Sequence, residues 1–253
     1  MNVLSNVRAE QCIPEPGLRI RNAGFFTLVL VVIASGYCAA VRAQAVKTPY
    51  PEMAPVAQYM MPESEEIAWA RSAAPASISA NADVMVLRRD GYATAVKGTT
   101  GWVCMVERAW ANNTNAPDFW NPKLRAPHCF NPPAARSFLP IYLMKTKMVM
   151  AGERSKEKIV QATEAAFKSG KLPALEPGAA AYMMSKQQYL GDRDQRWHPH
   201  VMFFAPGDQT KTWGADLADS PVIAANDPQE HVTILFVVAD KWSDGTPGPP
   251  MGR

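Results

Sequence analysis

Apolar and polar positions follow a helical period in three parts of the chain, and these parts are predicted to be helices. The three ranges are residues 62–73, about 134–151, and 156–169. Pro62 stands at the first position of the first helix, and three glutamates in its first turn suit the helix dipole. Ser155 precedes the third helix as an N-cap, and Gly170 follows it as a stop.

Short apolar runs bounded by turn residues predict six strands. The six ranges are residues 84–87, 92–97, 102–108, 180–186, 200–205 and 232–239. Asp90-Gly91 is a favoured hairpin turn, and we expect the first three strands to form an antiparallel meander. The last strand is apolar on both faces, which predicts a central position in the sheet.

The order of elements is helix, three strands, two helices, three strands. This order predicts a single α+β domain with an antiparallel sheet of five or six strands and two to three helices on one face. The domain is expected over residues 62–241. Residues 46–61 are rich in proline and predict an extended arm, and residues 242–253 predict a flexible tail.

The first 45 residues have the pattern of a secretory signal peptide. Arg19 and Arg21 precede an apolar run over residues 25–34, and residues 43–45 read Ala-Gln-Ala, a cleavage site. The run is too short to span a bilayer comfortably. We therefore expect an exported protein, periplasmic or secreted, with no stable membrane anchor after cleavage; an uncleaved anchor is the alternative. Because the stretch before Arg19 is long for a signal peptide, translation from near Leu18 is a further hypothesis.

Removal of the leader changes both the charge and the number of cysteines. Four of the 26 Lys and Arg and two of the 23 Asp and Glu lie in residues 1–45, so 22 basic and 21 acidic residues remain. No basic run survives, and nucleic acid is not an expected partner. Cys104 and Cys129 are the cysteines that remain, and in an exported protein they are expected to form one disulfide. A thiolate nucleophile or a metal ligand is the alternative.

Residues 109–133 show no period and are rich in asparagine and proline, which predicts a long loop. A disulfide at Cys129 would fix this loop to the third strand. Its aromatic residues would either line a ligand groove or seat the loop on the core. They are Trp110, Phe119, Trp120 and Phe130.

Potential chemistry concentrates in residues 197–207, where His198 and His200 flank a proline at the start of a predicted strand. Alternation along a strand would place both imidazoles on one face. Such a pair could bind a divalent metal such as zinc, act in acid–base chemistry, contact a ligand, or form an ordinary polar strand edge.

A metal site needs a third and usually a fourth ligand. His128 could arrive with the long loop. Asp192 and Asp194 lie in the loop between strands 180–186 and 200–205, at the histidine end of that hairpin. His231 begins the last strand and would lie at the far end. The candidate ligands are therefore His198, His200, His128, Asp192 and Asp194.

Several common catalytic signatures are absent from the sequence. There is no G-x-S-x-G nucleophile elbow, no H-E-x-x-H zinc motif, no phosphate-binding glycine loop and no C-x-x-C pair. The sequence leaves open whether the protein is an enzyme, and it identifies no cofactor beyond a possible divalent metal.

Four segments carry a resemblance to a group of uncharacterised exported bacterial proteins. They are ARSAAP at 70–75, KGTTGWVCMVER at 97–108, PHCFNP at 127–132 and WHPHVMFFAP at 197–206. The likeness spans roughly residues 60–240. It implies one exported domain that contains both cysteines, and it implies no activity, cofactor or catalytic residue.

The sequence supports three hypotheses. The first is a non-catalytic exported domain that binds a small molecule or a metal ion near His198 and His200, beside the aromatic loop. The second is a metal-dependent or general acid–base hydrolase that uses the same histidines. The third is a structural or partner-binding envelope protein.

Overall fold

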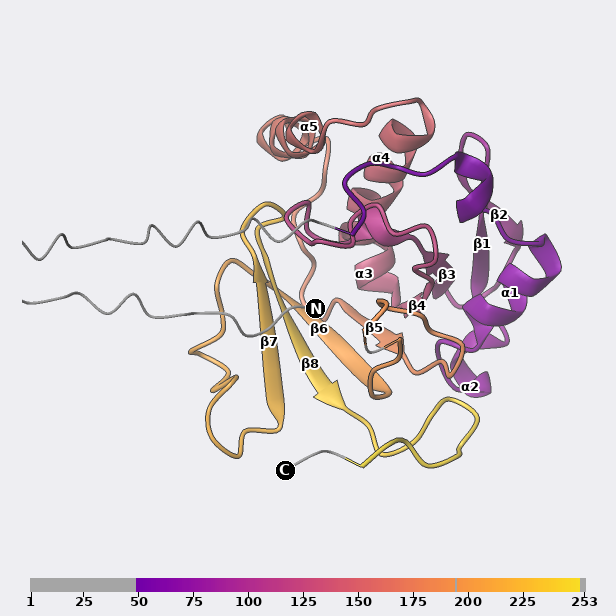
Figure 1. The fold of residues 1–253 in the computed structure, drawn as a ribbon. Coiled ribbons are helices and arrows are strands. Elements are labelled where there is room, and N and C mark those ends of the chain that lie inside the picture. The colour runs from indigo at the N-terminus through magenta and orange to yellow at the C-terminus, as the bar shows by residue number, and fades with distance from the viewer. Residues whose placement is uncertain (1–48, 194, 251–253) are drawn as a thin grey trace, which may run out of the picture. The chain divides into compact units, whose positions relative to one another are not determined.

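The computed structural model of the protein describes residues 49–193 and 195–250. These residues form one α+β unit with a mixed sheet of eight strands and five α-helices (Figure 1). The predicted signal peptide and Asp194 lie outside the described residues. Within the described ranges, no helix is long and apolar enough to cross a membrane.

All three predicted helical regions and all six predicted strands are present. The helices are η1 Val56–Tyr59, α1 Glu63–Arg71, α2 Ala76–Ser79, η2 Ala109–Ala111, α3 Pro132–Ser137, α4 Leu139–Met150 and α5 Lys156–Lys168. The strands are β1 Asp83–Arg88, β2 Gly91–Val96, β3 Val103–Glu107, β4 Ala126–Phe130, β5 Ala180–Met183, β6 His200–Pro206, β7 Val222–Asp227 and β8 Val232–Val238. Ser155 caps α5 as predicted, because its Oγ accepts a hydrogen bond from the backbone N–H of Lys158.

The sheet is larger than predicted, and it is mixed instead of antiparallel. The strand order is β2-β1-β3-β4-β5-β6-β8-β7, and β1 and β3 run parallel while the other neighbours are antiparallel. The β1–β2 hairpin is confirmed, but the predicted meander is wrong because β3 pairs with β1. A side chain at Gly98 would meet the backbone of Ala82 at 2.3 Å, so the chain passes directly over the start of β1 after leaving β2. The central position of β8 is confirmed.

Two strands, β4 and β7, were not predicted. β4 lies inside the expected long loop, and all five of its residues are buried between β3 and β5. A strand buried on both faces shows no alternation, and the proline at position 127 argues against a strand. β7 is a short edge strand with two alanines and an Asn-Asp end, residues of low strand propensity.

Helices cover both faces of the sheet around β3, and the expectation of helices on one face is wrong. Cys104 and Val106 of β3 pack in one cluster with Ala70 of α1 and with Ala73 and Ala74, which follow that helix. Met105, which points the other way, packs with Phe138 and Tyr142 of the α3–α4 region. The strands in the middle of the sheet are therefore buried on both sides, which is why their sequences read as continuous apolar runs.

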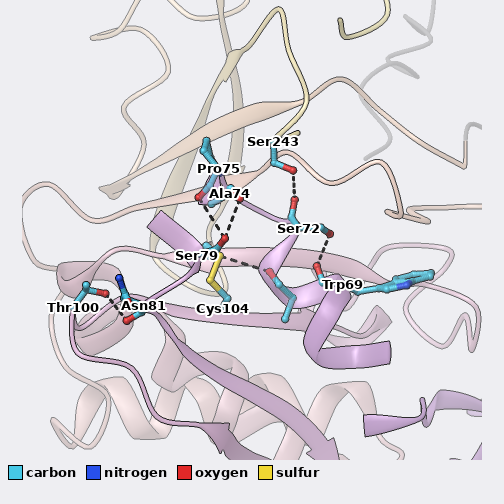
Figure 2. The surroundings of a disulfide bond; sticks show 11 residues. Trp69, Ser72, Ala74, Pro75, Ser79, Asn81, Thr100, Cys104 and Ser243 are labelled. Atoms are coloured by element: carbon cyan, nitrogen blue, oxygen red, sulfur yellow. Dashed lines mark hydrogen bonds between the residues drawn. A yellow bond between two sulfur atoms is a disulfide. The ribbon is translucent and has the colours of Figure 1, made fainter. Parts of the chain in front are cut away.

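The predicted Cys104–Cys129 disulfide is confirmed. The two cysteines face each other across β3 and β4, with their Cα atoms 4.0 Å apart, so the bond joins two adjacent strands. Figure 2 shows it beneath the corner between α1 and α2, where Ser72 Oγ donates to the carbonyl of Trp69 and Ser79 Oγ to that of Ala74.

Both segments expected as an arm and a tail pack against the domain in the described part of the chain. Tyr59 in η1 is fully buried, its hydroxyl donates to the carbonyl of Trp120, and its own carbonyl accepts from Arg108 Nε. After β8, Trp242 is buried and Ser243 Oγ donates to the carbonyl of Ser72. These contacts extend the core beyond residues 62–241.

Candidate functional site

The four aromatic side chains of the predicted loop lie in the core. Trp110, Phe119, Trp120 and Phe130 are each at most 2 % exposed. Trp110 Nε1 donates to Thr146 Oγ1 of α4, and its ring packs 5.0 Å from that of Tyr59. These side chains pack residues 109–133 against the core. Of the two predicted alternatives, core packing is therefore the one found, and the ligand groove is not.

His198 and His200 lie at the start of β6, as the sequence indicates. The strand begins at His200, whose side chain is 1 % exposed and lies on the α4 side of the sheet with Met202 and Phe204. His198 precedes the strand and is partly buried. The ring of Trp197 contacts both imidazoles, with its centroid 5.8 Å from that of His198 and 4.7 Å from that of His200.

His128 reaches the same face of the sheet. Met183 of β5 stands opposite His200, and continuation of the β4–β5 register places His128 on the other side of Met183. The backbones of the two histidines are therefore two strand spacings apart, roughly 10 Å. Burial lowers the pKa of His128 to about 3, and the charge of His200 acts in the same direction.

Asp192 does not join the histidines. Its exposed carboxylate accepts hydrogen bonds from the hydroxyls of Tyr189 and Tyr50 and from Lys123 Nζ, and these bonds lower its pKa to about 2. Asp194 lies outside the described residues. His231 precedes β8, whose first residue pairs with the last residue of β6, so its predicted distance from His198 is confirmed. Among the described residues, no three His, Cys, Asp or Glu side chains are placed to hold a metal ion.

The start of β6 contains an unusual number of unused hydrogen-bonding atoms. Seven buried side-chain atoms in the described ranges have no hydrogen-bond partner, and three of them are Gln188 Oε1, His198 Nδ1 and His200 Nε2. The Gln188 side chain is bonded to this segment, because its Nε2 donates to the carbonyl of Trp197 at 2.7 Å. Native proteins seldom leave buried polar atoms unpaired, so such a group calls for an explanation.

The hydrogen bonds that these side chains do make determine whether an unpaired atom is a donor or an acceptor. His200 Nδ1 lies 2.7 Å from the carbonyl of His198, so Nδ1 carries the hydrogen and Nε2 carries a lone pair. Burial lowers the pKa of His200 to about 4, which keeps this imidazole neutral at neutral pH. Because the Gln188 amide nitrogen is occupied, Oε1 is the free acceptor. At least two of the three atoms therefore offer lone pairs to a donor or a metal ion.

A second group of buried ionisable residues lies on the same face, and the sequence does not reveal it. Lys145 of α4 is 3 % exposed, and its Nζ donates to Glu230 Oε1 at 2.7 Å and to the carbonyls of Ala111 and Asn112 at 3.2 and 3.0 Å. The three hydrogens of the ammonium group are thus all used. Its signal in the sequence is a single lysine among the apolar positions of a helix.

Glu107 and His128 stand beside this ion pair. Glu107 Oε2 lies 3.2 Å from His128 Nδ1, which also lies 3.0 Å from the carbonyl of Ala126. Burial raises the pKa of Glu107 well above its usual value, and the charge of Glu230 adds to this effect. Since the pKa of His128 is lowered, both groups are neutral at neutral pH, and their contact is not an ion pair. The charge of Lys145 balances the carboxylate of Glu230, and the carboxyl group of Glu107 keeps its proton.

No family model, no curated protein and no solved structure matches the chain. The resemblance to uncharacterised exported proteins therefore stays a prediction.

Proposed function

We propose that the protein is an exported binding domain that takes a small molecule or a metal ion at the start of β6. The observation that carries this proposal is the set of three buried, unpartnered atoms, Gln188 Oε1, His198 Nδ1 and His200 Nε2. They belong to one short segment and to a side chain bonded to it. A bound species would satisfy atoms whose burial otherwise costs free energy.

The chemistry of the three atoms limits what can bind. Two imidazole nitrogens and an amide oxygen are suitable ligands for zinc or a similar divalent ion, with water to complete the coordination. The same atoms would accept hydrogen bonds from a small molecule that carries N–H or O–H groups. The neutral state of His200 favours both, because a protonated imidazole has no free lone pair.

Metal analysis of the mature protein tests the metal form of the proposal. Wild type purified without chelators is compared with His198→Ala/His200→Ala, and we expect about one equivalent of Zn, Cu, Ni, Fe or Mn in wild type alone. Gln188→Leu, which removes the amide oxygen, is expected to weaken metal retention. If wild type holds none of these metals, the metal form is wrong and a small organic ligand is the remaining form.

A general acid–base hydrolase is a second candidate, and the neutral Glu107 carboxyl group beside His128 favours it. A protonated carboxyl group and a neutral imidazole are the states that a general acid and a general base require. Both residues are at most 6 % exposed, so a substrate could reach them only after a movement of the covering segments. A hydrolase of this kind would lose at least roughly a hundredfold in kcat with Glu107→Gln. Equal kcat of this variant and wild type on any substrate that turns over would exclude this role.

A further inference from the structure

A groove of about 370 Å³ opens where η1 and α1 meet the end of β1. Its apolar wall is formed by Met60, Met61, Val86 and Leu87, and its charged residues are Glu63, Glu66, Arg88 and Arg89. This volume falls at the lower end of the range for small-molecule sites, roughly 300–1,000 Å³. The groove shares no residue with the segment around His198 and His200.

Glu66 lines this groove and has an unused acceptor atom. Its side chain is fully buried, and its Oε1 accepts hydrogen bonds from the backbone N–H of Leu87 at 3.1 Å and from Arg108 Nη2 at 2.9 Å. Its Oε2 is buried and has no partner among the described residues. A carboxylate oxygen in this position favours a donor that carries positive charge, since charge-assisted hydrogen bonds are the stronger ones.

The rim of the groove carries the opposite charge. Arg88 pairs with Glu63 at 3.1 Å, and both side chains are about half exposed, at 49 % and 54 %. Arg89, the next residue, is exposed at the turn after β1. A ligand seated on Glu66 would therefore present its outer end to the guanidinium group of Arg89, which suits a carboxylate, beside the Arg88–Glu63 pair.

The wall between these two ends suits an apolar group. Met60 and Met61 are partly buried, and methionine side chains are flexible and polarizable, so they adapt to apolar shapes. Val86 and Leu87 of β1 also line the groove, and both are buried. The order along the groove is thus a buried acceptor, an apolar wall and a cationic rim.

We propose that this groove binds an apolar amino acid or a short peptide. Its ammonium group donates to Glu66 Oε2 after a movement of the covering side chains, because Glu66 is fully buried. Its side chain packs against Met60 and Met61, and its carboxylate meets Arg89 at the rim. This is a second site, separate from the one at the start of β6. The His198→Ala/His200→Ala variant therefore keeps its affinity for the amino acid, and the two proposals fail independently.

Isothermal titration of the mature protein with leucine, methionine and phenylalanine tests the proposal. Isocaproate, which lacks the ammonium group of leucine, and isoamylamine, which lacks its carboxylate, are the matched controls. We expect at least one of the three amino acids to bind, and the controls to bind roughly tenfold more weakly or not at all, since each lacks a charge-assisted contact.

Substitutions in and outside the groove test whether the amino acid binds there. Arg89→Glu reverses a rim charge on an exposed residue and is expected to weaken binding roughly tenfold, whereas Lys171→Glu, an equal charge change outside the groove, leaves it unchanged. Glu66→Gln is expected to abolish binding. If Glu66→Gln does not fold, Arg89→Glu and the two control ligands still test whether the groove binds the amino acid. Absence of binding by all three amino acids, equal binding of isocaproate, or equal affinities of Arg89→Glu and Lys171→Glu would overturn the proposal.

Discussion

Lys145 and His200 are both almost completely buried on the same face of the sheet, yet their surroundings differ. The ammonium group of Lys145 has three acceptors within 3.2 Å, and one of them is the carboxylate of Glu230. His200 uses one ring nitrogen and leaves the other unpaired, next to His198 and Gln188, which each have an unpaired atom of their own. The polar atoms around Lys145 nearly all have hydrogen-bond partners within the described part of the protein, whereas three atoms around His200 have none.

This difference suggests that the group around Lys145 stabilises the fold and that the group around His200 binds a ligand. The Lys145 group joins α4, the segment that follows β3 and the turn between β7 and β8, so its bonds hold the fold together. Its unpaired atom is Glu107 Oε1, and protonation of that carboxyl group removes the charge. The group at the start of β6 holds atoms that a bound species would complete. Substitutions in the first group should therefore change stability, and substitutions in the second should change binding.

The largest expected effect is at Lys145. Lys145→Met leaves the carboxylate of Glu230 buried without its partner, and loss of one member of a buried pair costs about 3–5 kcal/mol. Urea unfolding measures the loss. Lys147→Met on the exposed side of the same helix is the matched control and should change the free energy of unfolding by less than about 0.5 kcal/mol. Equal stability of the two variants would show that the Lys145 pair does not hold the fold.

The disulfide should have the next largest effect. It closes a loop between residues 25 positions apart, for which the chain-entropy model gives about 3.5 kcal/mol. Cys104→Ala/Cys129→Ala and reduced wild type should both lose this amount in denaturant unfolding and keep the ligand of His198 and His200. A variant that folds with full stability but loses the ligand would contradict the separation of the two regions.

Glu107→Gln should change how stability depends on pH. The pKa of Glu107 is raised in the folded protein, so as pH rises above the unfolded value the unfolded carboxyl group ionises while the folded one stays protonated. The free energy of unfolding of wild type therefore falls with rising pH until the folded pKa is passed. The variant should lack this decline and be the more stable protein at neutral pH. Parallel curves for the two proteins between pH 5 and pH 8 would mean that Glu107 is ionised in the fold.

His200→Phe should have the smallest effect on stability. At pH 7 the free energy of unfolding should change by no more than about 1 kcal/mol, because a ring of similar shape remains and an unpaired acceptor is removed. The pKa of His200 is lowered to about 4 in the fold, so wild type loses stability as pH falls from 6.5 toward 4, and the variant lacks this part of the loss. Thermal unfolding at pH 7 and pH 5 measures both effects. A large loss at pH 7 together with unchanged ligand binding would assign His200 to the core.

Much of the fold could be predicted from local pattern, and its topology could not. The helix from Lys156 is predicted correctly because its cap, its apolar stripe and its stop all lie within one short segment. The parallel pairing of β1 and β3 depends on how the chain crosses at Gly98, which leaves no periodic signal. β4 is a strand because β3 and β5 enclose it, in spite of Pro127.

The candidate site shows the same limit. His198 and His200 could be identified because they are neighbours in the sequence. Lys145 and Glu230 are 85 residues apart, and the fold alone brings them together. Gln188 carried no signal in the sequence, since its role depends on the bond to the carbonyl of Trp197.

Native mass spectrometry of the protein, expressed from its full sequence and purified without chelators, tests the central claim most directly. We predict that wild type and Lys147→Met carry one bound metal ion or small molecule of constant mass, and that His198→Ala/His200→Ala carries none while remaining folded. If wild type has the mass of the bare chain, or if the double variant retains the same bound species, the start of β6 is not the binding site.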